Sequence, residues 1–165
     1  MLPKIIFTKL EKTHYPPKKP IVAWDGNCGF CHYWVLRWKT ISGVKVEFHP
    51  FQNVAKDFPD IENRFFKQAI RMIDTDGKIY GGPAAAFRAF EYGNKYRWIM
   101  PLYRRFKLFE WGADHFYSFV SRNRNFMYKV TVRLWGRNPI RQKNYWAYYL
   151  GGLTVLITGL ILLVR

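Results

Sequence analysis

The stretch Ile21-Val22-Ala23-Trp24-Asp25-Gly26-Asn27-Cys28-Gly29-Phe30-Cys31-His32 contains the features that decide the fold. Its first four residues are all apolar, and such a continuous run predicts a short buried strand. The polar residues that follow predict a tight turn, and Asn27 is a suitable N-cap for a helix. Two cysteines, three positions apart, then fall in the first turn of that helix. We therefore expect a strand–turn–helix unit with a pair of sulfur atoms at the helix N-terminus.

This position favours redox chemistry at the two cysteines, which are the only ones in the chain. Unpaired N–H groups and the positive end of the helix dipole stabilise an anion such as a thiolate. Cys28, nearer the helix start, is the candidate nucleophile, and Cys31 is close enough to form or resolve a disulfide. Asp25 is the third candidate catalytic residue, as a proton acceptor for the resolving thiol. The alternatives are an Asx-type turn role for Asp25 and a purely structural cysteine pair.

The residues that follow predict an α/β domain built around this unit. Further elements are expected at these positions: a helix ending at Gly43, strands over 44–48, 69–73 and 78–80, a loop with a short helix over 51–64, an Asp76-Gly77 turn, and a helix from Gly82-Pro83 to Gly93. The resulting order, β-α-β-(α)-β-β-α, is that of a thioredoxin-like domain. We assign residues 20–95 to this domain.

The segments on either side of the domain differ from it in composition. Residues 1–19 form an N-terminal extension or linker that carries no secretory signal and ends in a proline-rich run. Residues 96–140 form a basic helical extension, with helices predicted over 102–109 and 113–135. The longer helix carries an apolar stripe made of Phe116, Val120, Met127, Val130 and Leu134.

The C-terminal segment 145–164 contains no charged residue. Its length matches the ~20 residues that cross a bilayer core, and its early aromatic residues resemble an interfacial belt. We therefore expect a single-pass transmembrane helix at the C-terminus. More basic residues precede this segment than follow it, which places the main domain in the cytoplasm by the positive-inside rule. The expected localisation is thus membrane-anchored.

The formal net charge of +16 implies an anionic partner. Because many of the basic residues lie beside the predicted span, we expect that partner to be an anionic phospholipid membrane. A membrane-protein partner is compatible with the same arrangement. We do not expect nucleic acid as a partner, and we expect the substrate to be a protein thiol or disulfide.

Together, Asp25, Cys28 and Cys31 form an Asp-x-x-Cys-x-x-Cys signature. With it, the chain resembles the DCC family of thiol-disulfide oxidoreductase-like proteins. Residues 70–85 and 116–124, the latter similar to the family's Tyr…Arg-Asn-Arg stretch, extend the match to roughly 20–135. The resemblance implies a thioredoxin-like domain that exchanges thiols and disulfides through the two cysteines. The chain departs from thioredoxins at 67–70, where they place a cis-proline before the strand that faces the active site.

The predicted function is therefore that of a membrane-tethered thiol-disulfide oxidoreductase. One alternative is a non-enzymatic, membrane-anchored assembly or interaction subunit with structural cysteines. Another is c-type haem attachment at the C-x-x-C-H string of residues 28–32, with His32 as axial ligand, although this needs export and no signal peptide is present. The remaining histidines are scattered without zinc-ligand spacing. We therefore predict neither a metal nor a cofactor.

Overall fold

The computed structural model describes residues 5–93 and 95–163 of the chain. Within them, four strands form one mixed sheet in the order β2-β1-β3-β4. The strands are β1 (Ile21–Trp24), β2 (Glu47–Pro50), β3 (Arg71–Ile73) and β4 (Ile79–Gly81). β1 pairs with β2 in parallel and with β3 antiparallel, and β3 pairs with β4 antiparallel. This sheet and its helices fit the predicted thioredoxin-like domain.

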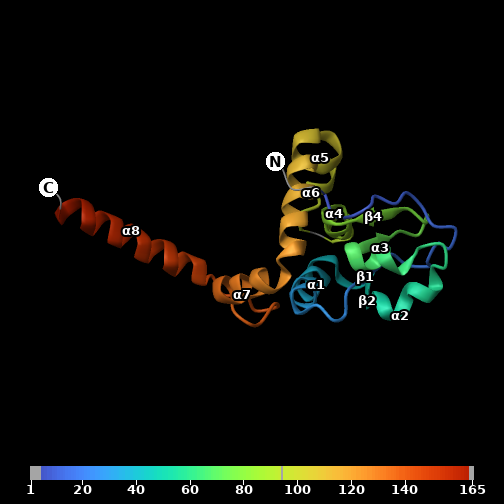
Figure 1. Ribbon diagram of the computed structural model, residues 1–165, viewed down its shortest axis with the longest axis horizontal. Coiled ribbons are helices and arrows are strands. Elements are labelled where there is room, and N and C mark those ends of the chain that lie inside the picture. The colour runs from blue at the N-terminus through green and yellow to red at the C-terminus, as the bar shows by residue number, and fades with distance from the viewer. Residues whose placement is uncertain (1–4, 94, 164–165) are drawn as a thin grey trace.

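Helices cover both faces of the sheet (Figure 1). Side chains alternate along β1, so Val22 and Trp24 contact α1 (Gly29–Ser42) and α4 (Pro83–Tyr92). Ala23 points to the opposite face, which is covered by α2 (Phe51–Val54) and α3 (Asn63–Gln68). Two short 3₁₀ turns complete the domain: η1 (Gly43–Lys45) and η2 (Ala55–Asp57). The strand predicted from residue 44 begins only at Glu47 because η1 takes up residues 43–45.

The described part of the N-terminal extension packs against the sheet. The backbone N–H of Thr13 donates to the carbonyl of Gly77, and that of Ile79 donates to Glu11, both at 2.9 Å. Further along, the carbonyl of Thr8 accepts a hydrogen bond from the Arg71 guanidinium at 2.7 Å. Residues 5–13 therefore act as part of the domain, while residues 1–4 lie outside the described residues.

The basic extension forms three helices, which are α5 (Ile99–Arg105), α6 (Lys107–Arg122) and α7 (Arg124–Trp135). The single helix predicted over 113–135 is interrupted at Asn123, whose backbone N–H donates to the carbonyls of both Phe119 and Val120. α7 then packs against α1, which brings the extension next to the start of the cysteine-bearing helix (Figure 1).

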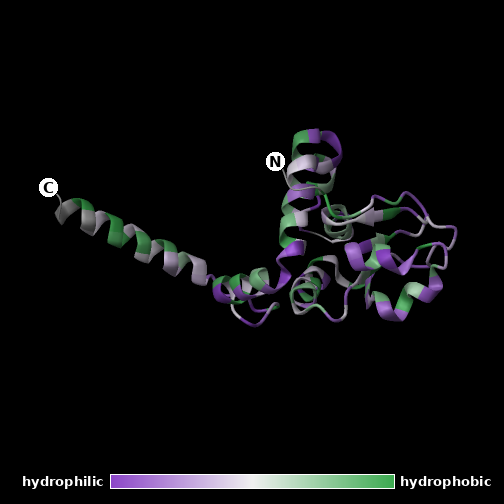
Figure 2. Cartoon of the chain, in the orientation of Figure 1, coloured by the Kyte–Doolittle hydropathy of each residue, from purple (hydrophilic) through white to green (hydrophobic). Residues whose placement is uncertain are grey.

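The last helix, α8 (Tyr145–Leu163), extends from α7 away from the sheet domain (Figure 1). Over the part of the chain that the structure describes, no helix combines the length and the apolarity needed to cross a membrane. The prediction of a transmembrane helix over 145–164 is therefore wrong. Aromatic residues with polar atoms occupy the first turns of α8, and Gly and Thr residues interrupt the rest, so apolar and less apolar turns alternate along the helix (Figure 2). Val164 and Arg165 lie outside the described residues.

Other predictions that depended on this span are corrected with it. The single-pass C-terminal anchor is not supported, and the membrane-anchored localisation with a cytoplasmic domain was inferred from that anchor alone. The phospholipid membrane and the membrane-protein partner were inferred in the same way and lose their basis. The lack of charged residues over 145–164 does not by itself predict a membrane span, because the Tyr, Gly and Thr residues lower the hydropathy of the segment.

Candidate thiol-disulfide site

The turn between β1 and α1 positions the two cysteines at the start of α1. The backbone N–H of Cys28 donates to the Asp25 carbonyl at 3.1 Å, which closes the turn. Cys28 is the N-cap of α1, and its Sγ accepts the backbone N–H of Cys31 at 3.1 Å. Asn27 was expected to be the N-cap, but the sulfur atom one residue later takes this role. Cys28 thus satisfies one of the N–H groups that a helix N-terminus leaves free.

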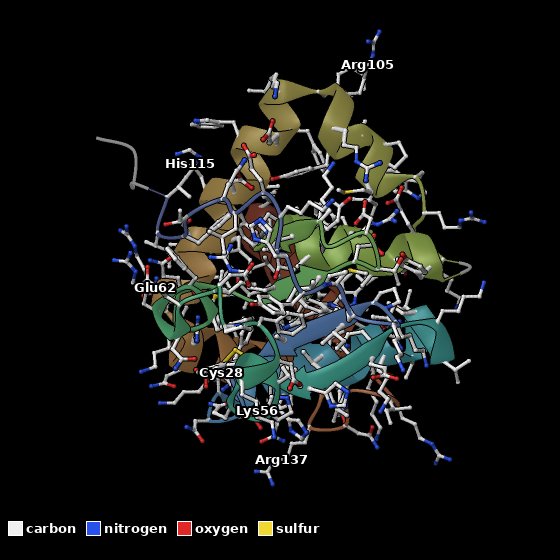
Figure 3. The ribbon with its side chains drawn as sticks, turned by 90° about the vertical axis from the view of Figure 1, so that its right-hand side faces the viewer. Cys28, Lys56, Glu62, Arg105, His115 and Arg137 are labelled. Atoms are coloured by element: carbon white, nitrogen blue, oxygen red, sulfur yellow. A yellow bond between two sulfur atoms is a disulfide. The ribbon has the colours of Figure 1, made fainter. Side chains whose placement is uncertain are left out.

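Cys28 and Cys31 are joined by a disulfide, which lies at the start of α1 (Figure 3). Their Cα atoms are 5.2 Å apart, within the range usual for disulfides. Both residues are half-buried, so the pair sits at the boundary between the domain interior and the solvent. A pair in this position can be reached by an external thiol and can also contact the interior.

The Asp25 carboxylate is held by three hydrogen-bond donors. Its Oδ1 accepts the backbone N–H of Asn27 and the side-chain amide of Gln52, both at 3.2 Å. Its Oδ2 accepts Nη1 of Arg124 at 3.3 Å. The Asn27 contact is the Asx-type turn that the sequence left open, and the other two contacts link the turn to more distant parts of the fold.

Gly26 lets the turn approach β2 closely. A Cβ at this position would lie 3.0 Å from Cβ of Pro50 and 3.1 Å from Oε1 of Gln52. The same Oε1 accepts the backbone N–H of Gly26 at 3.2 Å. Gln52 therefore contacts the turn through both Oε1 and Nε2 of its side-chain amide. A larger residue at position 26 would displace the Gln52 side chain.

Two aromatic residues, Trp24 and His32, stack on each other beside the cysteine pair. Trp24 is 8% exposed and stacks on the exposed His32, with the ring centroids 5.4 Å apart. His32 of the C-x-x-C-H string therefore packs beside the disulfide, and both sulfurs of that string are bonded to one another.

The backbone just before β3 is occupied by a side chain of α6. The hydroxyl oxygen of Tyr117 accepts the N–H of Ile70 at 3.1 Å. Burial raises the pKa of Tyr117, so this group stays protonated at neutral pH. Thioredoxins place their cis-proline at this position, and here the segment 67–70 has no proline.

Sequence reasoning located Asp25, Cys28 and Cys31 in one turn but missed two of their neighbours. Gln52 was assigned to a loop with a short helix, and Arg124 was noted only as part of the basic helical extension and of the Arg-Asn-Arg stretch. The signal for Arg124 was its position in a stretch shared with the family. Nothing in the local pattern linked it to Asp25, which lies 99 positions earlier.

A mixed sheet with a C-x-x-C disulfide at the first turn of α1 fits the class of thioredoxin-like proteins. The family model described as DCC1-like thiol-disulfide oxidoreductase matches residues 22–130, which is more than half of the 165 residues. The chain therefore belongs to the DCC1-like thiol-disulfide oxidoreductase family. No curated protein and no solved structure gave a significant match. Family membership and the cysteine pair together support a redox function.

Proposed function

We propose that the protein exchanges a dithiol for a disulfide with a protein substrate, using Cys28 as the nucleophile and Cys31 as the resolving cysteine. The observation that carries this proposal is the Cys28 Sγ at the N-cap of α1, where it accepts the Cys31 N–H at 3.1 Å. In the reduced protein, the same N–H and the helix dipole stabilise a thiolate on Cys28. Among the described residues, no backbone N–H donates to Sγ of Cys31, three positions further along the helix.

The exchange proceeds in two steps. The Cys28 thiolate attacks a substrate disulfide, so that a mixed disulfide forms and one substrate sulfur leaves as a thiolate. Cys31 then attacks Sγ of Cys28, forms the internal disulfide and releases the second substrate sulfur. Two electrons pass to the substrate. One proton for the two substrate thiolates comes from the Cys31 thiol, and the other comes from solvent, which took up the Cys28 proton when the thiolate formed. The reverse sequence oxidises a substrate dithiol.

Asp25 supports this reaction as a positioning residue. Its carboxylate holds the turn through Asn27, Gln52 and Arg124 at 3.2–3.3 Å. These bonds keep Cys28 at the N-cap while the disulfide opens and closes. An Asp25→Asn variant keeps the size of the side chain but loses the ion pair. We expect it to slow exchange, whereas Asp57→Asn, an exposed substitution away from the site, should leave the rate unchanged.

Trapping tests the assignment of the two cysteines. A Cys31→Ser variant expressed in cells should accumulate a mixed disulfide between Cys28 and its substrate, identifiable by mass after alkylation. Cys28→Ser is the matched control and should trap nothing. A trap at Cys31 in the Cys28→Ser variant would reverse the two roles.

A redox titration tests whether the pair is active at all. Alkylation of the purified protein across a glutathione series should show a cooperative two-electron transition between disulfide and dithiol. A pair that never changes state across the series, combined with no trapped partner, would contradict the proposal. The cysteines would then be structural, and a non-enzymatic assembly or interaction role would be favoured.

A further inference from the structure

The two parallel strands of the sheet end side by side. β1 and β2 pair in parallel, and the last pair in their register is Trp24 opposite Pro50. Because parallel strands run in the same direction, the segments that follow them leave the sheet at the same edge. The cysteine-bearing turn follows β1, and α2 follows β2. Gly26 and Gln52 each lie two positions beyond the last strand pair, and the fold brings them into contact.

The backbone of α2 is anchored on either side of Gln52, although the Gln52 residue itself is exposed. Phe51 and Val54 are buried, and the Phe51 ring stacks on Phe66 of α3 with the ring centroids 5.9 Å apart. An exposed glutamine ordinarily samples several rotamers, so its own contacts must hold it in one of them. The contacts that do so are those with the turn.

Both polar atoms of the Gln52 side-chain amide bond to the turn. Its Oε1 accepts the backbone N–H of Gly26, and its Nε2 donates to Oδ1 of Asp25, both at 3.2 Å. A side-chain amide offers an acceptor and a donor at once, whereas an ionised glutamate only accepts and a methionine sulfur is a weak acceptor. The two bonds together therefore require a glutamine rather than another side chain of the same length.

Gln52 and Arg124 hold the Asp25 carboxylate from two different layers of the fold. Gln52 bonds to Oδ1 from α2, which covers one face of the sheet. Arg124 bonds to Oδ2 at 3.3 Å from α7, which packs against α1 on the other face. Contacts at both oxygens fix the orientation of the carboxylate. The carbonyl of Asp25 also accepts the N–H of Cys28 at 3.1 Å, so a displacement of Asp25 is passed directly to Cys28.

We propose that Gln52 is a positioning residue for the Cys28–Cys31 pair. It fixes the backbone at Gly26 and the carboxylate of Asp25, and through them it keeps Cys28 at the N-cap of α1, where a thiolate is stabilised. In the described part of the chain, no hydrogen bond joins Gln52 to either sulfur atom, so its effect passes through the turn. The inference rests on the proposed thiol-disulfide exchange and adds a residue that acts on it from α2.

Gln52→Glu tests this role because it replaces the amide by a carboxylate of the same shape. The variant keeps an acceptor for the Gly26 N–H but places a second negative charge beside Asp25, where Arg124 supplies the compensating charge. The two carboxylates then repel each other, which displaces Asp25 and opposes a negative charge on Cys28. Other charged side chains lie on the elements packed against α2: Glu47 and His49 of β2, paired at 3.2 Å, and the exposed Lys56 and Asp57 of η2.

The measurement is the rate at which iodoacetamide alkylates Cys28 between about pH 5 and pH 10 in a Cys31→Ser background. This rate follows the thiolate and needs no protein substrate. At neutral pH, Gln52→Glu should lower it by about threefold to tenfold and move the midpoint of its pH profile upward. Gln52→Met, which loses both hydrogen bonds without adding a charge, should lower it by about twofold to tenfold. Asn53→Asp is the matched control. It adds the same charge at an exposed position of α2 that makes no hydrogen bond to the turn among the described residues, so the profile should not change.

A double-mutant cycle shows whether Gln52 acts through Asp25. In an Asp25→Asn background the second carboxylate has no charge to repel, so Gln52→Glu should change the alkylation rate much less than it does in the parent. An equal effect in both backgrounds would overturn the proposal, and so would an unchanged pH profile in Gln52→Glu. If thermal melts show that Gln52→Glu does not fold, Gln52→Met decides, and a parental rate in that variant would overturn the proposal.

Failure of the proposed exchange gives a different result. If Cys28 of the parent is alkylated with the pH profile of a free cysteine, the activation of Cys28 at the N-cap is contradicted, whatever the Gln52 variants do. If the parent shows an activated Cys28 and neither Gln52 variant alters it, only the role of Gln52 is contradicted. The Cys31→Ser trap with a protein substrate then still tests the exchange itself.

Discussion

Nη1 of Arg124 lies 3.3 Å from Oδ2 of Asp25, so the first residue of α7 is paired with the residue that precedes the cysteine turn. The two side chains are 23% and 26% exposed, which leaves the pair partly shielded from solvent. Arg124 is further held by Ser121, whose Oγ accepts its Nη2 at 2.9 Å. The Arg-Asn-Arg stretch thus has a structural role in this chain, because its last residue, Arg124, connects α7 to the cysteine-bearing turn.

This pair should show a measurable coupling in a double-mutant cycle. Asp25→Asn and Arg124→Gln, alone and combined, should give a coupling of about 0.5–1 kcal/mol in the free energy of unfolding at low salt. The coupling should shrink at high salt because the pair is partly exposed. Urea unfolding measures it. Lys129→Gln, an exposed change on α7, should not couple to Asp25→Asn, and a coupling of equal size there would point to a nonspecific charge effect.

Much of the site was predictable because it is local in sequence. An apolar run, a polar turn and two cysteines lie within residues 21–32, and the fold places them as a strand, a turn and a helix start. Asp25 contacts Gln52 and Arg124, which lie 27 and 99 positions further along the chain, and no sequence periodicity predicts contacts between residues so far apart. The break at Asn123 was also missed, because apolar spacing continues through it from α6 into α7.

An apolar groove between α1 and α4 on one side and α6 and α7 on the other illustrates a different limit of sequence reasoning. The stripe from Phe116 to Leu134 was predicted correctly as apolar, and an apolar stripe ordinarily packs against a core. Here it lines the groove, because the position of α6 and α7 over α1 is set by long-range contacts such as the bond between Tyr117 and Ile70. Periodicity predicts which face is apolar, but it does not predict how closely that face is packed.

Gly82 should not tolerate a side chain. Its φ is +59°, and a Cβ would lie 2.7 Å from Cζ of Phe7. We expect Gly82→Ala to lower the free energy of unfolding by about 1–3 kcal/mol. Gly112 is the matched control, because it lies within α6 and a Cβ added there would meet open space, so Gly112→Ala should raise stability by about 0.5–1 kcal/mol. Urea unfolding of both variants checks the opposite signs, and a loss of similar size at both positions would refute the argument.

The contribution of Asp74 to the free energy of unfolding should be lost in acid. Burial alone would raise the pKa of this carboxyl group, but hydrogen bonds from Tyr92 and Arg88 outweigh it and lower the pKa below its usual value. The unfolded chain therefore binds more protons at Asp74 than the folded one. The stabilisation is present above the unfolded pKa of about 3.9 and is lost as the pH falls through the folded value.

The measurement is urea unfolding of the wild type and Asp74→Asn between pH 7 and pH 2. The variant should be less stable at neutral pH, and its stability should fall less steeply than that of the wild type below about pH 4. Asp57→Asn changes an exposed carboxylate and should follow the wild-type curve. Parallel curves for the wild type and Asp74→Asn would show that Asp74 is not responsible for the acid sensitivity.

Arg71 should not be replaceable by lysine. It is fully buried in β3, and its Nε and Nη1 donate to the carbonyls of Phe65 and Thr8 at 3.1 and 2.7 Å. Burial lowers the pKa of Arg71 to about 10. A lysine has a single ammonium group and cannot reach both carbonyls in the same geometry, so one of them loses its charged donor. We expect Arg71→Lys to lower the free energy of unfolding by about 1.5–3 kcal/mol, as measured by urea unfolding. The exposed Arg64→Lys change should lower the free energy of unfolding by less than about 0.5 kcal/mol. Similar losses for the two variants would contradict a stabilising role for the hydrogen bonds from Arg71 to the Phe65 and Thr8 carbonyls.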